Sequence, residues 1–344
     1  MTAQAAAVAP LGVSVPLGGP LGAQRERIRE LVAWGYTDLW SAESSGVDGF
    51  TPLALASAWA PGVRLGTAVV PVYTRGPATL AQSAAALAQA APGRFALGVG
   101  TSSDVIVERW NGVPFAEPYR RARDTLRFLR AALAGEKVTA AYDTFEVKGF
   151  RLTAGEPPDP PVPLLLAALR PQMLRLAARE ADGAVVNWLS PADAVRVTGI
   201  VREIAPEAEI VARLFVCPNP DRAAVMPAAK RMLAGYVSVA VYRAFHVWLG
   251  REAMLTPLWE RWDSGDRAGA LKQIPEELVD DVLTNGTPAE CRDRIAAYVA
   301  NGVTTPALHV LPFGGLDAHE GYRLLSPAAA RGAPGFRQPN SARP

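Results

Sequence analysis

The stretch LGTAVVPVYTRGP, residues 65–77, decides the fold. It begins as an apolar run from Leu65 to Val70 and then reaches an aromatic residue, a hydroxyl and a cation before Pro77. Apolar residues at consecutive positions indicate a strand buried on both faces, as in a parallel sheet. Pro77 suits the first position of a helix, and apolar residues then recur on one helical face. The stretch therefore predicts a buried parallel strand joined to a helix by a polar turn.

The same alternation of strand and helix repeats along the chain. Further apolar runs lie at residues 11–17, 37–42, 94–100, 162–168, 183–188, 209–217 and 304–311. Helix start signals stand between them, such as Ser190 before Pro191 and a capping box from Thr287 to Glu290. Eight strands alternating with helices predict an α/β fold of the (β/α)8 TIM-barrel type, with a doubly wound Rossmann-type sheet as the alternative.

Two stretches interrupt the alternation. Residues 136–161, after the fourth helix, predict a hairpin that turns near Tyr142 to Thr144, followed by a Pro-rich loop. Residues 222–284, before the eighth strand, are mostly helical and long for one connection. We expect a single domain over residues 11–325 that contains both insertions. A flexible N-terminus (1–10) and a disordered tail (326–344) flank it, because the tail has no apolar periodicity.

Composition limits the partners of the protein. The chain has 344 residues, 20% of them charged, and a net charge of +2. No basic stripe points to nucleic acid, and no apolar run is long enough to cross a bilayer. The first ten residues lack the features of a secretory signal, and two distant cysteines, Cys217 and Cys291, form no disulfide framework. These features predict a cytoplasmic protein that acts on a small-molecule substrate.

Several familiar chemistries lack their motifs. The histidines at 246, 309 and 319 are scattered, so a metal centre is not expected. The segment from Gly100 to Asp104 departs from the GxSxG pattern, which makes a serine hydrolase a minor alternative. GVGTSS, residues 98–103, has Ser103 where a dinucleotide fingerprint needs its third glycine.

In a barrel, the functional residues follow the C-terminal ends of the strands. Those ends are rich in hydroxyls and small residues, which suits a flat polar cofactor that carries the chemistry itself. They lie at residues 14–16, 42–45, 69–75, 100–103, 168–170, 187–188 and 311–315. The helix that starts near Pro171, with Arg170 before it, is a candidate phosphate site, and an ordinary strand-to-helix turn is the alternative.

Four segments, in order, resemble the bacterial luciferase-like superfamily of flavin and deazaflavin oxidoreductases. They are LGTAVVPVYTRGP (65–77), APGRFALGVGTSS (91–103), LAALRPQMLRLAAREADGAVVNW (166–188) and GTPAECRDRIAAYVANGV (286–303). The match covers most of residues 11–315. YTRGP and VVNW are most similar to the branch that uses the deazaflavin coenzyme F-420, and less similar to the FMN monooxygenases.

The resemblance implies a specific cofactor site. The third strand of the family carries a bulge with a non-proline cis peptide behind the ring, which by position would join Ala68 to Val69. Ala168 to Pro171 would bind the phosphate, and Trp188 would line the pocket or serve as a core plug. The implied cofactor-binding residues are Ser44, Thr67, Ala68, Val69, Gly100, Thr101, Ser102, Ser103, Ala168, Leu169, Arg170, Pro171, Asn187 and Trp188.

Glu43 is the candidate catalytic residue, as donor or acceptor of a proton, with a structural carboxylate as the alternative. Ser44 stands where relatives often have histidine, and Ser103 stands where the sugar-phosphate dehydrogenases of the family have glutamate. Both departures argue against sugar-phosphate oxidation.

Three functions remain open after these comparisons of motifs. The first is hydride transfer between coenzyme F-420 and a small organic substrate. The second is an FMN-dependent monooxygenase, and the third is a flavin- or deazaflavin-binding protein without turnover. Aromatic residues in the helical insertion and the barrel helices leave a homodimer open.

Overall fold

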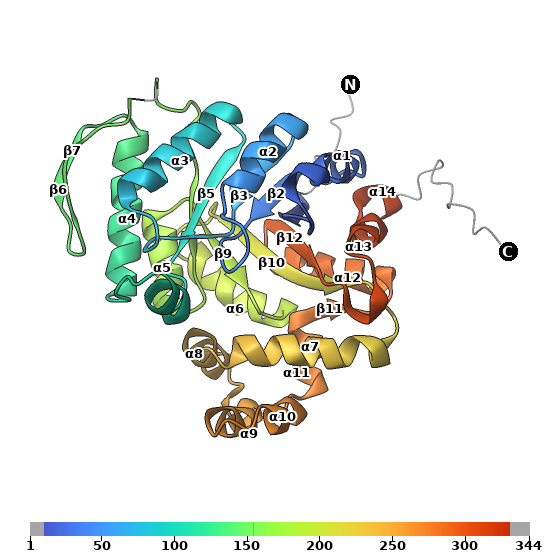
Figure 1. Cartoon of the computed structure of the whole chain (residues 1–344). Helices are drawn as coiled ribbons and strands as arrows, with labels where there is room; N and C mark the ends of the chain where they lie inside the picture. The colour runs from blue at the N-terminus through green and yellow to red at the C-terminus, as the bar shows by residue number, and fades with distance from the viewer. Residues whose placement is uncertain (1–9, 154, 331–344) are drawn as a thin grey trace.

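The computed structural model describes residues 10–153 and 155–330, and its centre is a closed ring of parallel strands (Figure 1). Strand β12 pairs with β1, and β9 pairs with β10, so the ring has no open edge. The TIM barrel predicted from the sequence is confirmed, and each predicted apolar run forms one barrel strand. These strands are β1 (Gly12–Val15), β2 (Asp38–Ser41), β3 (Arg64–Thr67), β5 (Phe95–Gly100), β8 (Leu164–Ala167), β9 (Gly183–Asn187), β10 (Glu209–Cys217) and β12 (Thr305–Val310).

Helices cover the outside of the ring and bury their apolar faces against it. Most of them begin with proline at the first helical position. The predicted capping box forms at Thr287 with Glu290, and the predicted N-cap Ser190 forms a second box with Asp193. The outer helices are α1 (Arg25–Ala33), α2 (Thr51–Trp59), α3 (Pro77–Ala90), α4 (Pro118–Leu133), α5 (Pro171–Glu180), α6 (Pro191–Arg202), α12 (Pro288–Ala300) and α13 (Ala318–Leu325). Short helical turns lie at Leu21–Gln24, Val105–Trp110 and Phe313–Gly315.

The barrel interior is packed in layers, because alternate residues of each strand point inward. Its central layer holds the indole of Trp40 among Ala96, Leu165, Val185 and Val211. Glycines at 12 and 66 make room for this ring, since a Cβ at either position would lie within 2.8 Å of indole atoms. The interior is therefore a filled core, and only its ends are open to ligands.

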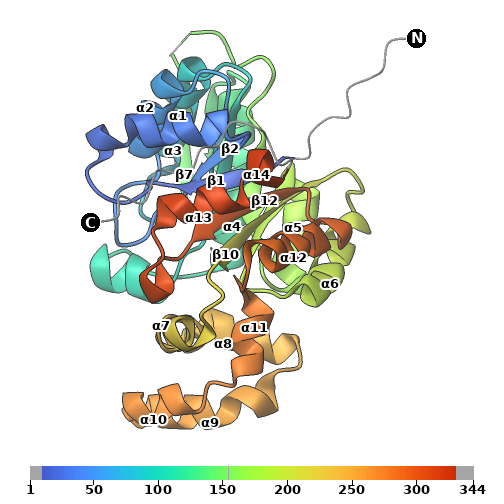
Figure 2. The ribbon, with the colours of Figure 1, turned by 90° about the vertical axis from the view of Figure 1, so that its right-hand side faces the viewer.

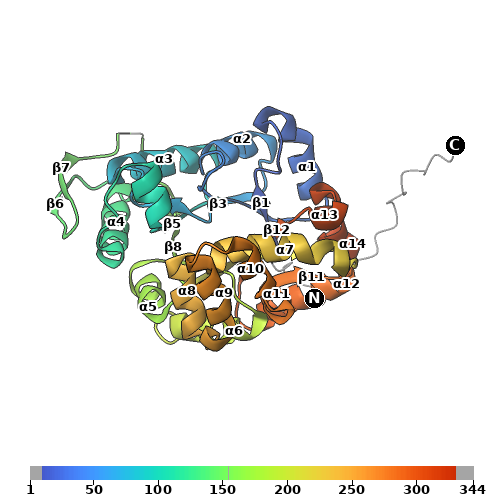
Figure 3. The ribbon, with the colours of Figure 1, turned by 60° about the horizontal axis from the view of Figure 1, so that its bottom comes forward.

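Two insertions depart from the simple barrel. An antiparallel hairpin of β6 (Val138–Ala141) and β7 (Glu146–Phe150) projects beside α4. After β10 the chain forms α7 (Arg222–Val237), α8 (Ala240–Trp248), α9 (Glu252–Asp263), α10 (Arg267–Lys272) and α11 (Glu276–Val282). Figures 2 and 3 show these helices gathered at the end of the barrel where β10 finishes. The short strand β11 (Leu283–Asn285) then pairs with β10.

The C-terminal segment is folded further than expected. Ser326 is buried, the helical turn α14 (Pro327–Ala330) follows, and the N–H of Ala328 donates to the carbonyl of Trp34 at 3.0 Å. The prediction of a disordered tail is therefore wrong for residues 326–330, because these residues pack against α1. The rest of the tail and residues 1–9 lie outside the described residues. Within the described ranges, no helix is long and apolar enough to cross a membrane.

Candidate functional site

The third barrel strand is interrupted at its C-terminal end. The peptide bond between Ala68 and Val69 is cis, as the resemblance implied, and separates β3 from the short strand β4 (Val70–Pro71). The N–H of Ala68 donates to the carbonyl of Ser41 at 2.5 Å, and the N–H of Glu43 donates to the carbonyl of Val69 at 3.0 Å. The interruption is thus held by β2 and by the residues that follow it.

The wall around this bulge is built from small residues. A Cβ placed on Gly100 would lie 2.7 Å from Val69 Cγ2 and 2.9 Å from the Cβ of Ala167. A Cβ on Gly98 would lie 2.0 Å from the carbonyl oxygen of Thr67. These close approaches require glycine at both positions. The result is a flat wall that suits one face of a planar ring.

Thr67 does not face the open end of the barrel. Its side chain is fully buried, and its hydroxyl donates to the carbonyl of Gly98 at 2.7 Å and accepts from the N–H of Gly98 at 2.8 Å. Ala68 and Val69 stay beside the mouth instead. Thr67 therefore supports the bulge from within the barrel wall.

The opposite wall carries polar groups that the sequence analysis missed. Arg213 of β10 and His309 of β12 occupy inward positions, and an N–H of Arg213 donates to Nδ1 of His309 at 3.4 Å. Asn187 of β9, which the sequence analysis did name, lies beside them and donates from Nδ2 to the hydroxyl of Tyr242 on α8 at 3.2 Å. The available signal was an arginine at an inward position of the otherwise apolar run EIVARLFVC (209–217).

Of the two roles considered for Trp188, the structure shows the core residue and not one that lines an open pocket. It is 2% exposed, and its indole stacks on Phe215 with ring centroids 4.1 Å apart. Tyr236 of α7 contacts it from the other side, with centroids 4.4 Å apart. Trp188 thus joins the barrel to the helical insertion, while Asn187 beside it reaches the mouth.

The candidate phosphate site lies at the start of α5. Ala168 is buried, and its N–H donates to the carbonyl of Val185 at 3.0 Å. Leu169 is half-buried, Arg170 is exposed at the N-cap, and Pro171 opens the helix. No acidic side chain lies in the first turn of α5. The helix dipole and the Arg170 guanidinium therefore both favour an anion here.

Glu43 and Ser44 lie on another side of the mouth, next to the turn that follows β4. Oε2 of Glu43 accepts from Arg75 at 2.8 Å and from the N–H of Gly49 at 3.0 Å, and Ser44 is exposed. A surface pocket between these residues is also lined by Thr74, Ile106 and Asn111.

Thr101, Ser102 and Ser103 follow β5 and are half-exposed. Ser102 adopts a positive φ of 62°, and the hydroxyl of Ser103 accepts from the N–H of Ile106 at 3.4 Å. The turn therefore presents its small polar side chains beside Gly100.

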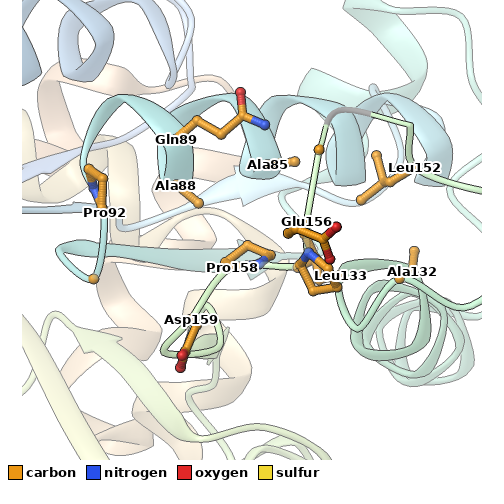
Figure 4. Close-up of a pocket in the computed structure, with 14 residues that line it drawn as sticks. Ala85, Ala88, Gln89, Pro92, Ala132, Leu133, Leu152, Glu156, Pro158 and Asp159 are labelled. Atoms are coloured by element: carbon orange, nitrogen blue, oxygen red, sulfur yellow. The ribbon is translucent and has the colours of Figure 1, made fainter.

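Another pocket lies outside the barrel and away from all of these residues (Figure 4). It is enclosed by α3, α4 and the Pro-rich loop, with Gln89, Leu133 and Pro158 among its lining residues. Pro92, also in its wall, precedes β5, so this pocket belongs to the N-terminal end of the strands.

Burial sets the protonation states of two groups at the mouth. It lowers the pKa of His309 to about 3, and the positive charge of Arg213 adds to this effect. It raises the pKa of the Tyr242 hydroxyl to about 12. His309 is therefore neutral and Tyr242 is protonated at physiological pH.

The candidate site thus lies in a parallel barrel, between an interrupted third strand and a polar wall on the opposite side. The profile described as luciferase-like monooxygenase matches residues 3–305, and the chain belongs to that family. It is 31% identical over 304 residues to a protein of Mycobacterium tuberculosis named as a coenzyme F-420-dependent oxidoreductase, covering 78% of this chain and 85% of the relative.

Further relatives carry similar names. A 5,10-methylenetetrahydromethanopterin reductase of Methanolobus tindarius is 25% identical over 286 residues, covering 78% of this chain and 84% of the relative. The fold is shared with the F-420-dependent tetrahydromethanopterin reductase of Methanopyrus kandleri, at a TM-score of 0.77 and 21% identity, covering 93% and 97% of the two chains. An F-420-dependent secondary alcohol dehydrogenase, solved with an F-420–acetone adduct, gives a TM-score of 0.73 and 18% identity, covering 93% and 98%.

Proposed function

We propose that this protein is an oxidoreductase that transfers a hydride between coenzyme F-420 and a small organic substrate. The observation that carries the proposal is the interruption of the third strand at Ala68 and Val69, set in a wall of small residues at the C-terminal end of the barrel. The names of its relatives in the luciferase-like family support the choice of coenzyme.

The residues at the mouth fit a planar ring with a phosphate tail. Ala68, Val69 and Gly100 would lie against one face of the ring, and the turn at residues 101–103 would flank it. The phosphate would lie at residues 168–171, where the helix dipole and Arg170 provide positive potential. The deazaflavin ring, when bound, supplies a carbon centre that donates or accepts a hydride.

The protein itself handles position, water and the proton. The helical insertion lies at this end of the barrel, and Tyr242 of α8 contacts Asn187 at the mouth, so the insertion shields the substrate from solvent. We assign proton exchange to Glu43, because its backbone is bonded to the bulge at Val69. Arg75 and the N–H of Gly49 both hold Oε2 and so orient the carboxylate.

An FMN-dependent monooxygenase is the second candidate. The family description favours it, and so does the shared fold with monooxygenase RslO1 of Streptomyces bottropensis, at a TM-score of 0.65 and 21% identity, covering 94% and 99% of the two chains.

Turnover separates the two functions. Oxidation of reduced coenzyme F-420 by a panel of small carbonyl compounds and alkenes, followed anaerobically by the return of the oxidised spectrum, is the result we expect. Oxygen consumption with reduced FMN, without oxidation of reduced F-420 by any compound, would instead establish the monooxygenase.

A further inference from the structure

Two arginines lie within the barrel strands, and only the first of them is paired with carboxylates. Arg64 donates to both oxygens of Glu209 at 2.6 and 2.7 Å and lies 3.5 Å from Asp38. Arg213 contacts Nδ1 of His309 and the ring of Phe215, and its buried Nε has no hydrogen-bond partner. Among the described residues, no carboxylate pairs with Arg213. Arg213 is half-buried, and a cation held partly out of water without an anion is costly, so this position calls for a negative charge from outside the protein.

The position of Arg213 along β10 places it at the functional end of the barrel. Glu209 lies at the N-terminal floor with Arg64, Val211 lies in the central layer, and Arg213 follows two residues later on the same inward face. Its register neighbour on β9 is Asn187, which reaches the mouth. Arg213 therefore points into the layer where a substrate would lie.

Arg213 also lies opposite the bulge. Going round the ring from β3, the strand β10 is four strands away in either direction, through β5, β8 and β9 or through β2, β1 and β12. A ring held against Ala68 and Val69 would turn its free face toward β10. The substrate would then lie between that face and Arg213.

The neighbours of Arg213 complete a set of hydrogen-bond donors. Because Nδ1 of His309 accepts from the guanidinium, the proton of the neutral imidazole is on Nε2, which is a donor. Burial keeps His309 neutral, since its pKa is lowered to about 3, so it adds no second positive charge. A guanidinium beside a neutral N–H donor suits two oxygens that share one negative charge.

We propose that Arg213 binds a carboxylate of the substrate, and that the enzyme acts on small organic acids that carry one negative charge. This inference rests on the proposed function, because it places the substrate in the same site. One inward-facing guanidinium limits the charge of the ligand, and Lys230 on α7 of the insertion is already paired with Glu276 at 3.6 Å. A single arginine favours a monoanion over a phosphate dianion.

Matched pairs of acids and amides test the proposal without knowledge of the substrate. Benzoate and benzamide, and cinnamate and cinnamamide, are titrated calorimetrically into the protein with and without coenzyme F-420. We expect each acid to bind at least tenfold more tightly than its amide. Arg213→Met should weaken acid binding by about tenfold to a hundredfold and leave amide binding unchanged. Arg213→Lys should restore part of the preference, and Arg27→Met, which removes an exposed cation of α1, should keep all of it.

Each outcome bears on one claim. Equal binding of acids and amides by the wild-type protein, or an acid preference that survives Arg213→Met, would overturn the role of Arg213. Arg213→Met should also melt no lower than the wild type, since it removes an unpaired charge, and a large loss of stability would indicate a structural role instead. An acid preference in a protein that binds no coenzyme F-420 would refute the proposed function and leave the anion site standing.

Discussion

The hydroxyl of Thr67 donates to the carbonyl of Gly98 at 2.7 Å and accepts from the N–H of the same residue at 2.8 Å. One side chain thus replaces two ladder bonds between β3 and β5 directly before the cis bulge. The absence of a side chain on Gly98 permits the contact, because a Cβ there would lie 2.0 Å from the carbonyl oxygen of Thr67. This pair of residues therefore connects the pairing of β3 with β5 to the wall proposed to hold the cofactor.

Replacing Thr67 with valine tests that link. Valine keeps the shape but leaves both polar groups of Gly98 unpaired, so we predict a loss of about 1–3 kcal/mol in the free energy of unfolding. Binding of coenzyme F-420 should weaken as well, because the bulge loses its support. Thr67→Ser, which keeps the hydroxyl, is the matched control. Urea unfolding and fluorescence titration of both variants check the prediction, and a valine variant as stable as the serine variant would contradict it.

Gly100→Ala tests the flat wall. The added methyl group would meet Val69 and Ala167 at less than 3 Å and push into the space proposed for the ring. We expect coenzyme F-420 to bind at least tenfold more weakly. Gly199→Ala in α6 is the control, because a Cβ there meets nothing within 4 Å. That control should bind normally and gain roughly 0.5–1 kcal/mol of stability. Unchanged coenzyme binding by Gly100→Ala would place the ring elsewhere.

Glu43→Gln tests the proposed proton-transfer group. We predict a fall in kcat of about 10²–10⁴-fold with little change in coenzyme binding, measured with a substrate found in the turnover screen. Arg75→Gln removes the partner at 2.8 Å but keeps the carboxylate. If Glu43 transfers the proton, its variant loses far more activity than Arg75→Gln and also loses a limb of the pH profile. Similar losses in both variants would show that the ion pair is only structural.

The burial of His246 predicts that the stability of the protein depends on pH. It is fully buried on α8, neither ring nitrogen has a hydrogen-bond partner, and burial, with Arg251 adding to it, lowers its pKa to about 4. Asp193 opposes this shift. In the unfolded chain His246 takes up a proton near pH 6.5, and in the folded protein it does so only near pH 4. The stabilising contribution of neutral His246 is therefore fully present above pH 6.5 and is lost as the pH falls toward 4.

The size of this effect is measurable. The contribution of His246 that is lost at pH 5 is about 2 kcal/mol, from about 1.36 kcal/mol per unit of pKa shift. His246→Leu should therefore unfold near the wild-type urea midpoint at pH 7.5 and lose about 2 kcal/mol less than the wild type at pH 5. Equal acid losses in the two proteins would contradict the account. His309, whose pKa burial lowers to about 3, adds an acid-dependent loss that is the same in both proteins.

The sequence predicted what local patterns control. Short apolar runs marked the barrel strands, Pro77 and Pro191 marked helix starts, and Thr287 with Glu290 formed the expected cap. The cis bond at Ala68 came from the family resemblance, since nothing in local propensity requires it. These features depend on a few neighbouring residues, which is why they could be predicted without the fold.

The polar wall could not be predicted in the same way. Arg213 and His309 are 96 residues apart in the sequence. They meet only because β10 and β12 are neighbours in the ring and both side chains point into the barrel. Thr67 was misplaced for a related reason: its hydroxyl turns to Gly98, and only the pairing of β3 with β5 shows this. The burial of Trp188 could not be predicted, because Tyr236 of α7 in the insertion covers its ring. The folding of the segment after Ser326 could not be predicted either, because it depends on the long-range contact with Trp34.

Side-by-side fluorescence titration of the purified protein with oxidised coenzyme F-420 and with FMN tests the central claim most directly. The account predicts micromolar or tighter binding of coenzyme F-420, at least tenfold tighter than FMN, and weakening of that binding by Gly100→Ala. A preference for FMN, or failure to bind either molecule, would contradict the assignment of the wall at Ala68, Val69 and Gly100 to a deazaflavin ring.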